Sequence, residues 1–159
     1  MVNELINFLK ETFSPAVGVV LAAAIPVTEL RAAIPLAVSL GMAPLTAFFW
    51  SVLGNIIPIP ILLWILPKAM QWFTTDTWLG KRLDWWIART LKKGDQVEKY
   101  GAIGLLIFAA IPLPGTGAWS ASLAAVLFKV KPIVALWSIS AGVLIAGVVI
   151  TLVSIGLFH

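Results

Sequence analysis

From Pro132 to Phe158 the chain carries no charged side chain, and this segment is long enough to cross a bilayer as one helix. The rest of the chain has a similar character. Of its 159 residues, 60% are hydrophobic and 11% are charged, against about 25% charged in an ordinary soluble domain. So few charges cannot cover a water-soluble globule of this size. The composition predicts an all-α integral membrane protein and excludes a soluble enzyme, a DNA-binding domain and a disordered chain.

Side chains that carry catalysis or bind metals are scarce. The chain has no Cys, and its one His is His159, which excludes disulfides, iron–sulfur clusters and thiol catalysis. A single acid within the apolar segments provides no acid–base pair for hydrolysis. We therefore expect a protein that is not an enzyme and that needs neither a cofactor nor a metal ion.

Two short apolar runs within residues 16–43 flank the polar sequence PVTELR at 26–31. Each run has about ten residues and reaches about 15 Å as a helix, half the depth of a hydrocarbon core. Two half-length arms around a proline-bounded tip predict a re-entrant hairpin. One long kinked helix with two charges at its middle is the alternative. Residues 102–130 show the same pattern, with apolar arms on either side of PLPGTG at 112–117.

A membrane-spanning segment is expected after each hairpin, at Leu45–Leu66 and at Pro132–Phe158. The first thirteen residues predict an amphipathic helix lying on the membrane. The basic, tryptophan-rich linker at 67–100 predicts a second interfacial helix that contacts anionic headgroups, and we expect no binding to nucleic acid. The apolar face of this helix consists of Leu83, Trp86, Ile87 and Leu91.

The two halves of the chain form an internal repeat at a spacing of 88 residues. The matching pairs are Pro26 and Pro114, Thr28 and Thr116, Pro44 and Pro132, and Gly54 and Gly142. The order of elements also matches: interfacial helix, re-entrant hairpin, transmembrane helix. We expect one membrane domain at 1–159, with repeat 1 at about 1–66, the basic amphipathic linker at 67–100 and repeat 2 at about 101–159.

The topology of this repeat follows from counting the crossings. A hairpin returns to its own side and a single helix crosses, so the two copies would form an inverted repeat whose tips meet at the midplane. The side with the linker holds nine of the eleven basic residues. The positive-inside rule then predicts a multi-pass protein of the cell (inner) membrane, with the linker in the cytoplasm and both termini on the outer side.

The segments IPVTELRAAIP (25–35) and IPLPGTGAW (111–119) resemble the family of small multi-drug export proteins. More distantly, the two hairpins resemble the DedA/VTT superfamily, whose members are implicated in proton-dependent translocation of lipids, including polyprenyl phosphates. The resemblance implies an essential acid in the first hairpin, where this chain has Glu29. It also implies arginines in the second hairpin, but this chain has none between Gly101 and Phe128.

Glu29 is the expected proton-carrying residue, because desolvation inside a membrane favours a protonated carboxyl and an intramembrane acid is functional by default. Arg31 is expected to bind an anionic group of the substrate through its guanidinium fork, or else to act as the counter-ion of Glu29. Thr28 is expected to cap the half-helix that begins at Glu29.

The second tip is expected to bind a carboxylate or phosphate through free backbone N–H groups at the start of a half-helix near Ala118. A helix break that only packs against Glu29 is the alternative. The expected substrate-binding residues, in addition to Thr28 and Arg31, are Asn55, Pro114, Gly115, Thr116, Gly117, Trp119 and Ser120.

These observations predict a small secondary transporter, coupled to protons, for an amphipathic substrate. The substrate is either an anionic lipid of the polyprenyl-phosphate type or a cationic drug-like molecule. A non-transporting structural or assembly protein is the alternative. The expected partners are the lipid bilayer, protons, the substrate and a second copy of the chain, since small residues at Gly142 and Gly147 would support a homodimer.

Overall fold

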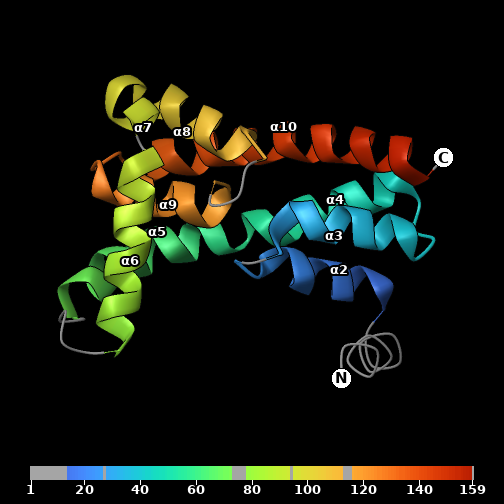
Figure 1. The fold of residues 1–159 in the computed structure, drawn as a ribbon, viewed down its shortest axis with the longest axis horizontal. Helices are drawn as coiled ribbons and strands as arrows, with labels where there is room; N and C mark the ends of the chain where they lie inside the picture. The colour runs from blue at the N-terminus through green and yellow to red at the C-terminus, as the bar shows by residue number, and fades with distance from the viewer. Residues whose placement is uncertain (1–13, 27, 73–77, 94, 113–115, 159) are drawn as a thin grey trace. The chain divides into compact units, whose positions relative to one another are not determined.

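The computed structural model describes residues 14–26, 28–72, 78–93, 95–112 and 116–158, and all regular structure in these ranges is helical (Figure 1). The amphipathic helix predicted for residues 1–13 lies outside the described residues. The helices are α2 Pro15–Ala24, α3 Glu29–Ser39, α4 Pro44–Ile56, α5 Pro58–Trp72, α6 Trp78–Lys93, α7 Asp95–Tyr100, α8 Ala102–Ala110, α9 Ala118–Leu127 and α10 Pro132–Phe158.

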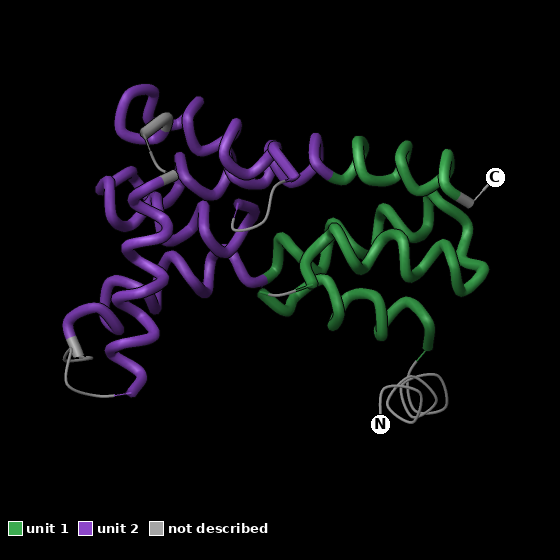
Figure 2. The backbone as a smooth tube through the Cα atoms, viewed as in Figure 1, with its two compact units in different colours: residues 1–57, 147–159 green, residues 58–146 purple. Residues whose placement is uncertain are grey.

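The chain divides into two compact units, which Figure 2 shows in different colours. Unit 1 consists of residues 1–57 and 147–159, and unit 2 of residues 58–146. In unit 1, α2 and α3 fold back against each other and both pack on α4. In unit 2, α9 packs against α5, α6 and α8, and α7 packs against α8. Each unit therefore contains one hairpin of two short helices, and the alternative of a single kinked helix at 16–43 is wrong.

The first arm of each hairpin ends for the same reason. Ile25 and Ile111 are extended, with φ/ψ of −79°/135° and −78°/117°, and each precedes a proline. A proline ring clashes with a helical residue before it and moves that residue into the extended region. Pro26 and Pro112 thus terminate α2 and α8 after about ten residues.

The second arms end in matching turns. Gly41 and Lys129 both hold a left-handed conformation, with φ of +86° and +55°. In each turn the N–H of the next residue donates to a carbonyl five positions back, at 3.0 Å in unit 1 and 2.9 Å in unit 2. This is the Schellman arrangement, which satisfies carbonyls left open at a helix end. Pro44 and Pro132 then begin α4 and α10. At the first position of a helix the N–H has no partner within the helix, so proline loses no hydrogen bond there.

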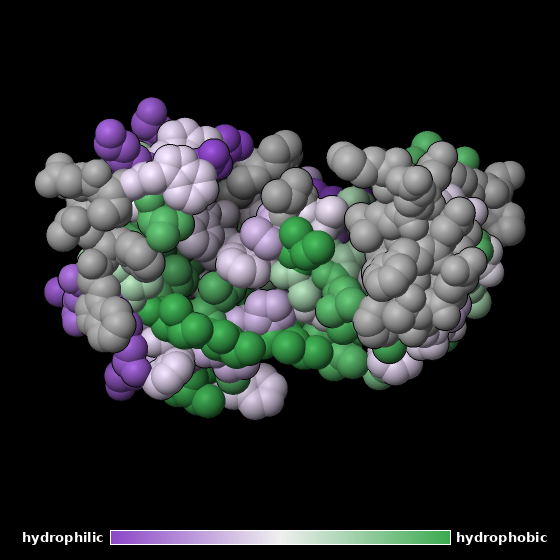
Figure 3. Space-filling view, turned by 90° about the horizontal axis from the view of Figure 1, so that it is seen from below, coloured by the Kyte–Doolittle hydropathy of each residue, from purple (hydrophilic) through white to green (hydrophobic). Residues whose placement is uncertain are grey.

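Two helical runs, Pro44–Gln71 and Pro132–Leu157, are long and apolar enough to cross a membrane. Only 44% and 39% of their most apolar windows are buried within the protein, whereas the core helix of a soluble protein is mostly buried. Figure 3 shows hydrophobic side chains next to one another at the surface. The exposed large side chains on α4 are Leu45, Phe49 and Leu53, and those on α5 include Ile61, Trp64 and Ile65.

The helix predicted in the basic linker is confirmed as α6, but much of its apolar face is covered by protein. Trp86 and Ile87 pack against the buried cluster of Leu62, Leu66 and Leu123. Leu91, by contrast, is exposed. The expectation of a helix that simply rests on the bilayer missed this packing, because a periodic apolar face has the same pattern whether lipid or protein covers it.

Candidate functional site

Glu29 is the first residue of α3 and the only charged residue that is buried among the described residues, with 7% of its surface exposed. Its backbone is left-handed, with φ of +43°, a conformation that is uncommon for residues other than glycine. Side chains two apart on a regular helix point away from each other. The left-handed start of α3 departs from that geometry, and Oε2 of Glu29 lies 4.0 Å from Nη2 of Arg31. The structure therefore brings the two predicted charges together.

Thr28 occupies the N-cap position of α3 as predicted, but its side chain makes no capping hydrogen bond. Its hydroxyl donates instead to the carbonyl of Ala22 and, at 3.4 Å, lies within reach of the carbonyl of Ile25. The prediction that the Thr28 side chain caps α3 is therefore wrong, because its hydroxyl bonds to α2 and not to the first turn of α3. The hydroxyl joins the tip to the end of α2 and so holds the start of α3 beside it.

The second tip repeats this arrangement in unit 2. Thr116 is 8% exposed, and its hydroxyl donates to the carbonyl of Ile111 at 2.6 Å. Gly117 follows with φ of +118°, and α9 begins at Ala118, as predicted. Two of the predicted binding residues, Pro114 and Gly115, lie outside the described residues.

Two further side chains predicted to bind substrate at this tip lie on α9. Ser120 is buried, at 7% exposed. The ring of Trp119 packs against the ring of Trp86 on α6, with centroids 6.4 Å apart. Trp119 therefore contributes to the packing of α9 on α6, a role that its position beside a proline–glycine tip did not suggest.

Asn55 and Ser51 lie four residues apart on the buried face of α4. Within the described residues, neither the Ser51 hydroxyl oxygen nor the Asn55 amide oxygen has a hydrogen-bond partner. Ile139 and Val143, 88 residues later, are buried apolar side chains. Unpartnered buried polar atoms are rare and often mark a functional position. Ser51 was missed at the sequence level, although its spacing of four from Asn55 places both on one helix face.

Both candidate membrane-spanning runs carry a glycine where another helix crosses closely. A Cβ at Gly54 would collide with the backbone of Val20 on α2, and one at Gly142 would lie 2.5 Å from the carbonyl oxygen of Leu106 on α8. A Cβ at Gly147 would likewise collide with the ring of Phe48. The two glycines expected at a homodimer interface, Gly142 and Gly147, are therefore covered by the chain's own side chains and backbone, and the homodimer stays a prediction.

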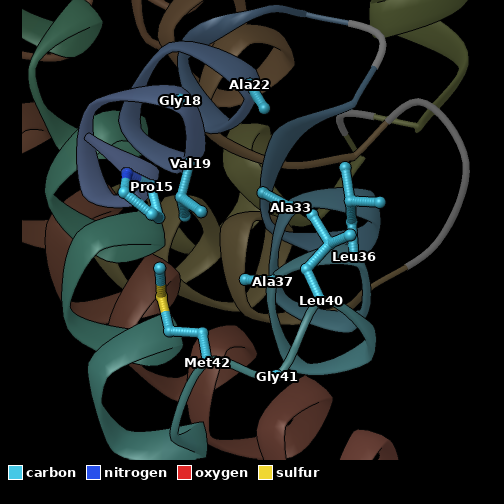
Figure 4. A pocket seen from close by; sticks show the side chains of 10 residues that line it. All are labelled: Pro15, Gly18, Val19, Ala22, Ala33, Leu36, Ala37, Leu40, Gly41 and Met42. Atoms are coloured by element: carbon cyan, nitrogen blue, oxygen red, sulfur yellow. The ribbon is translucent and has the colours of Figure 1, made fainter. Parts of the chain in front are cut away.

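A cavity of about 470 Å³ lies between the two arms of the first hairpin (Figure 4). Nonpolar residues line it, among them Val19 and Ala22 on α2 and Ala33 and Leu36 on α3, and it extends to Met42. Ala22 is the residue whose carbonyl holds Thr28. One end of the cavity therefore lies beside the polar tip that carries Glu29, and its volume is within the range of sites for small organic ligands.

A sequence model of the family described as "Putative small multi-drug export protein" matches residues 29–149. No curated protein and no solved structure gives a match to the chain. The more distant resemblance to the DedA/VTT superfamily is not tested by this match and stays a prediction. Because the matched residues make up most of the chain and include α3 to α9, the chain belongs to the small multi-drug export family, as its two hairpin segments predicted.

Proposed function

We propose that the protein is a small secondary transporter that exports amphipathic, drug-sized molecules across a membrane in exchange for protons. Membership of an export family and the two long apolar helices support a membrane location and a transport role. In this proposal Glu29 carries the proton, and Arg31, Ser51 and Asn55 contribute to the polar part of the substrate site. The location is the inner membrane.

The backbone of Glu29 is the observation that carries the proposal. A left-handed residue with a side chain costs about 1–2 kcal/mol relative to glycine, and residues under such strain are concentrated at functional sites. The corresponding residue of the second hairpin, 88 positions later, is Gly117, which adopts a positive φ without that cost. A buried carboxyl retained where glycine would be more stable indicates that its chemistry is used.

The architecture that we propose is an inverted repeat with re-entrant hairpins. Three features support it: the threonine hydroxyl bonds at 28 and 116, the Schellman turns at 41 and 129, and the glycine crossings at 54 and 142. Each recurs at a spacing of 88 residues. If the copies enter from opposite sides, the basic linker at 67–100 lies in the cytoplasm and both termini lie outside.

The cavity between α2 and α3 favours a substrate with an apolar body. The described residues that line it include no charged or amide side chain, so a polar group of the substrate would lie toward the tip, near Glu29. A cationic drug-like molecule would exchange directly with the proton on Glu29. In the second version, a lipid of the polyprenyl-phosphate type would place its headgroup at Arg31 and would use Glu29 for the proton.

Transport in proteoliposomes with an imposed pH gradient tests this function. With ethidium as a lipophilic cationic probe, the parent protein should move the probe when protons flow the other way, and Glu29→Gln should abolish that movement. Glu98→Gln is the matched control, because Glu98 is an exposed acid on α7. Undiminished ethidium movement by Glu29→Gln would remove Glu29 from the mechanism. A fluorescent polyprenyl phosphate and Arg31→Ala test the lipid version in the same vesicles.

A structural or assembly role is the second candidate, and the 4.0 Å approach of Glu29 to Arg31 favours it. In that case the two charges only hold the first hairpin together. The double variant Glu29→Gln with Arg31→Met removes both charges at once and avoids leaving one buried without the other. The structural role predicts normal function for this variant, whereas the transporter predicts a folded protein without proton-coupled export.

A further inference from the structure

One face of α6 carries alternating tryptophan and arginine side chains at the surface. Trp78, Arg82, Trp85 and Arg89 follow spacings of four, three and four residues, so they form one stripe along the helix. Trp78 is 68% and Trp85 is 61% exposed. The Arg82 guanidinium carbon lies 5.0 Å from the centre of the Trp78 ring, and that of Arg89 lies 5.3 Å from the Trp85 ring.

The opposite face of α6 fixes the orientation of this stripe. Trp86 and Ile87 pack into the cluster shared with α5 and α9, and Thr90 is buried. The helix therefore cannot rotate to bury Trp78 and Trp85 without losing that packing. Their exposure is a consequence of how unit 2 is assembled, and it leaves two large aromatic rings without a protein cover in the described part of the chain.

The stripe is also strongly cationic. The sequence of α6 contains five basic residues and one acid, Asp84. Within the described residues, neither Arg82 nor Arg89 forms an ion pair with a carboxylate. A guanidinium that stacks on a ring keeps its N–H edges directed outward, where they can bind two oxygens of one phosphate.

The same combination occurs where α5 approaches its end. The Lys68 ammonium lies 3.6 Å from the centre of the Trp64 ring, and Trp64 is 66% exposed. This pair lies within the last eight residues of the candidate membrane span Pro44–Gln71. Tryptophan is enriched at the boundary between hydrocarbon and headgroups, and long basic side chains reach from there to the phosphates. The position of Trp64 and Lys68 is where such a boundary is expected.

We infer that the Trp78–Arg82–Trp85–Arg89 face of α6 binds the phosphate headgroups of anionic phospholipids at the membrane surface. The rings would lie at headgroup depth and the two guanidinium groups would hold phosphates beside them. A second copy of the chain is a poor occupant, because two such faces would bring positive charge against positive charge. An anionic lipid surface supplies the opposite charge together with an apolar layer for the rings.

Native mass spectrometry of the full-length protein in detergent, titrated with phosphatidylglycerol or phosphatidylcholine, tests the inference. The double variant R82Q/R89Q should bind phosphatidylglycerol about tenfold more weakly than the parent, since it removes the two guanidinium groups that would hold the phosphates beside the exposed rings. Its binding of phosphatidylcholine should not change. K129Q/K131Q is the matched control, because it removes two exposed charges outside α6 and should retain parental affinity.

A further variant, R82K/R89K, keeps both positive charges but removes the planar guanidinium groups, so it separates recognition by these groups from the effect of charge alone. It also serves as the test if R82Q/R89Q folds poorly. It should bind phosphatidylglycerol more weakly than the parent and more tightly than R82Q/R89Q. Equal phosphatidylglycerol affinity for the parent and R82Q/R89Q would overturn the inference. An equal loss of phosphatidylglycerol affinity in K129Q/K131Q would also overturn it. So would the finding that R82Q/R89Q loses a protein dimer and not bound lipid.

Discussion

Glu29 and Gly117 both hold a positive φ, +43° and +118°, and each directly follows the threonine whose hydroxyl joins a hairpin tip to its first arm. Both tips therefore have a positive φ directly after the threonine, but different residues adopt it. Glycine meets the requirement at no steric cost, whereas glutamate adopts it under strain. The first tip gains a buried carboxyl 4.0 Å from Arg31 at the expense of local stability.

The strain at Glu29 predicts a difference between two substitutions. Glu29→Gly and Glu29→Gln both remove the carboxylate, but only glycine relieves the left-handed backbone. Glu29→Gly should therefore be more stable than Glu29→Gln by about 1 kcal/mol, and both should lack proton-coupled export. Unfolding of the detergent-solubilised proteins measures the difference. Equal stability of the two variants would show that the backbone at this position is not strained.

The close helix crossings predict that alanine is not tolerated at Gly54 or Gly142. The added methyl groups would meet the backbone of Val20 and of Leu106, which cannot move aside as a side chain could. Each substitution should lower the free energy of unfolding by about 1–3 kcal/mol. Gly156→Ala is the control, because no atom of the described residues lies within 4 Å of its Cβ position. A loss as large in Gly156→Ala would mean that the crossings are not the cause.

The amide oxygen of Asn55 has no hydrogen-bond partner among the described residues, and this predicts opposite effects of a substitution on stability and on function. Asn55→Val reproduces the residue found at Val143 and removes a buried polar group, so stability should be unchanged or about 1 kcal/mol higher. Ethidium transport should nevertheless fall if Asn55 contacts the substrate.

Ser122→Ala provides the comparison for Asn55→Val. The Ser122 hydroxyl already donates to the Ala118 carbonyl at 2.7 Å, so its loss should cost about 1 kcal/mol. Transport by Asn55→Val at the parental rate would exclude Asn55 from the substrate site.

The two Schellman turns predict opposite changes in stability when glycine replaces lysine at position 129 and when lysine replaces glycine at position 41. Lys129→Gly should stabilise the protein by about 1 kcal/mol, because glycine tolerates the φ of +55°. Gly41→Lys should destabilise it by a similar amount. Lys131→Gly, beyond the left-handed position, should not stabilise. Thermal unfolding midpoints of the three variants test this, and a gain from Lys131→Gly equal to that from Lys129→Gly would contradict it.

The helical hairpins were predictable because prolines have strong, local effects. Pro26 and Pro112 move the residues before them out of the helical region, and the apolar arms are too short to span a bilayer. The start of α9 at Ala118 followed from the glycines before it. Sequence spacing was also sufficient to identify Glu29 and Arg31 as the charges of the first tip.

Other features depend on contacts between distant segments, which a single sequence does not specify. The bond from Thr28 to Ala22 reaches back across the tip, and the packing of Trp119 on Trp86 joins α9 to α6. Ser51 was missed because its spacing of four from Asn55 indicates a shared helix face, but not that this face is buried against other helices. The apolar face of α6 was identified, but not the helices that cover it.

The release of protons on substrate binding tests the role of Glu29 most directly. Purified protein in weakly buffered detergent solution, with a pH indicator dye, is titrated with ethidium. If the probe displaces the proton held by Glu29, the parent should release protons in proportion to the ethidium bound, and Glu29→Gln should release none. Proton release from Glu29→Gln equal to that of the parent would contradict the account.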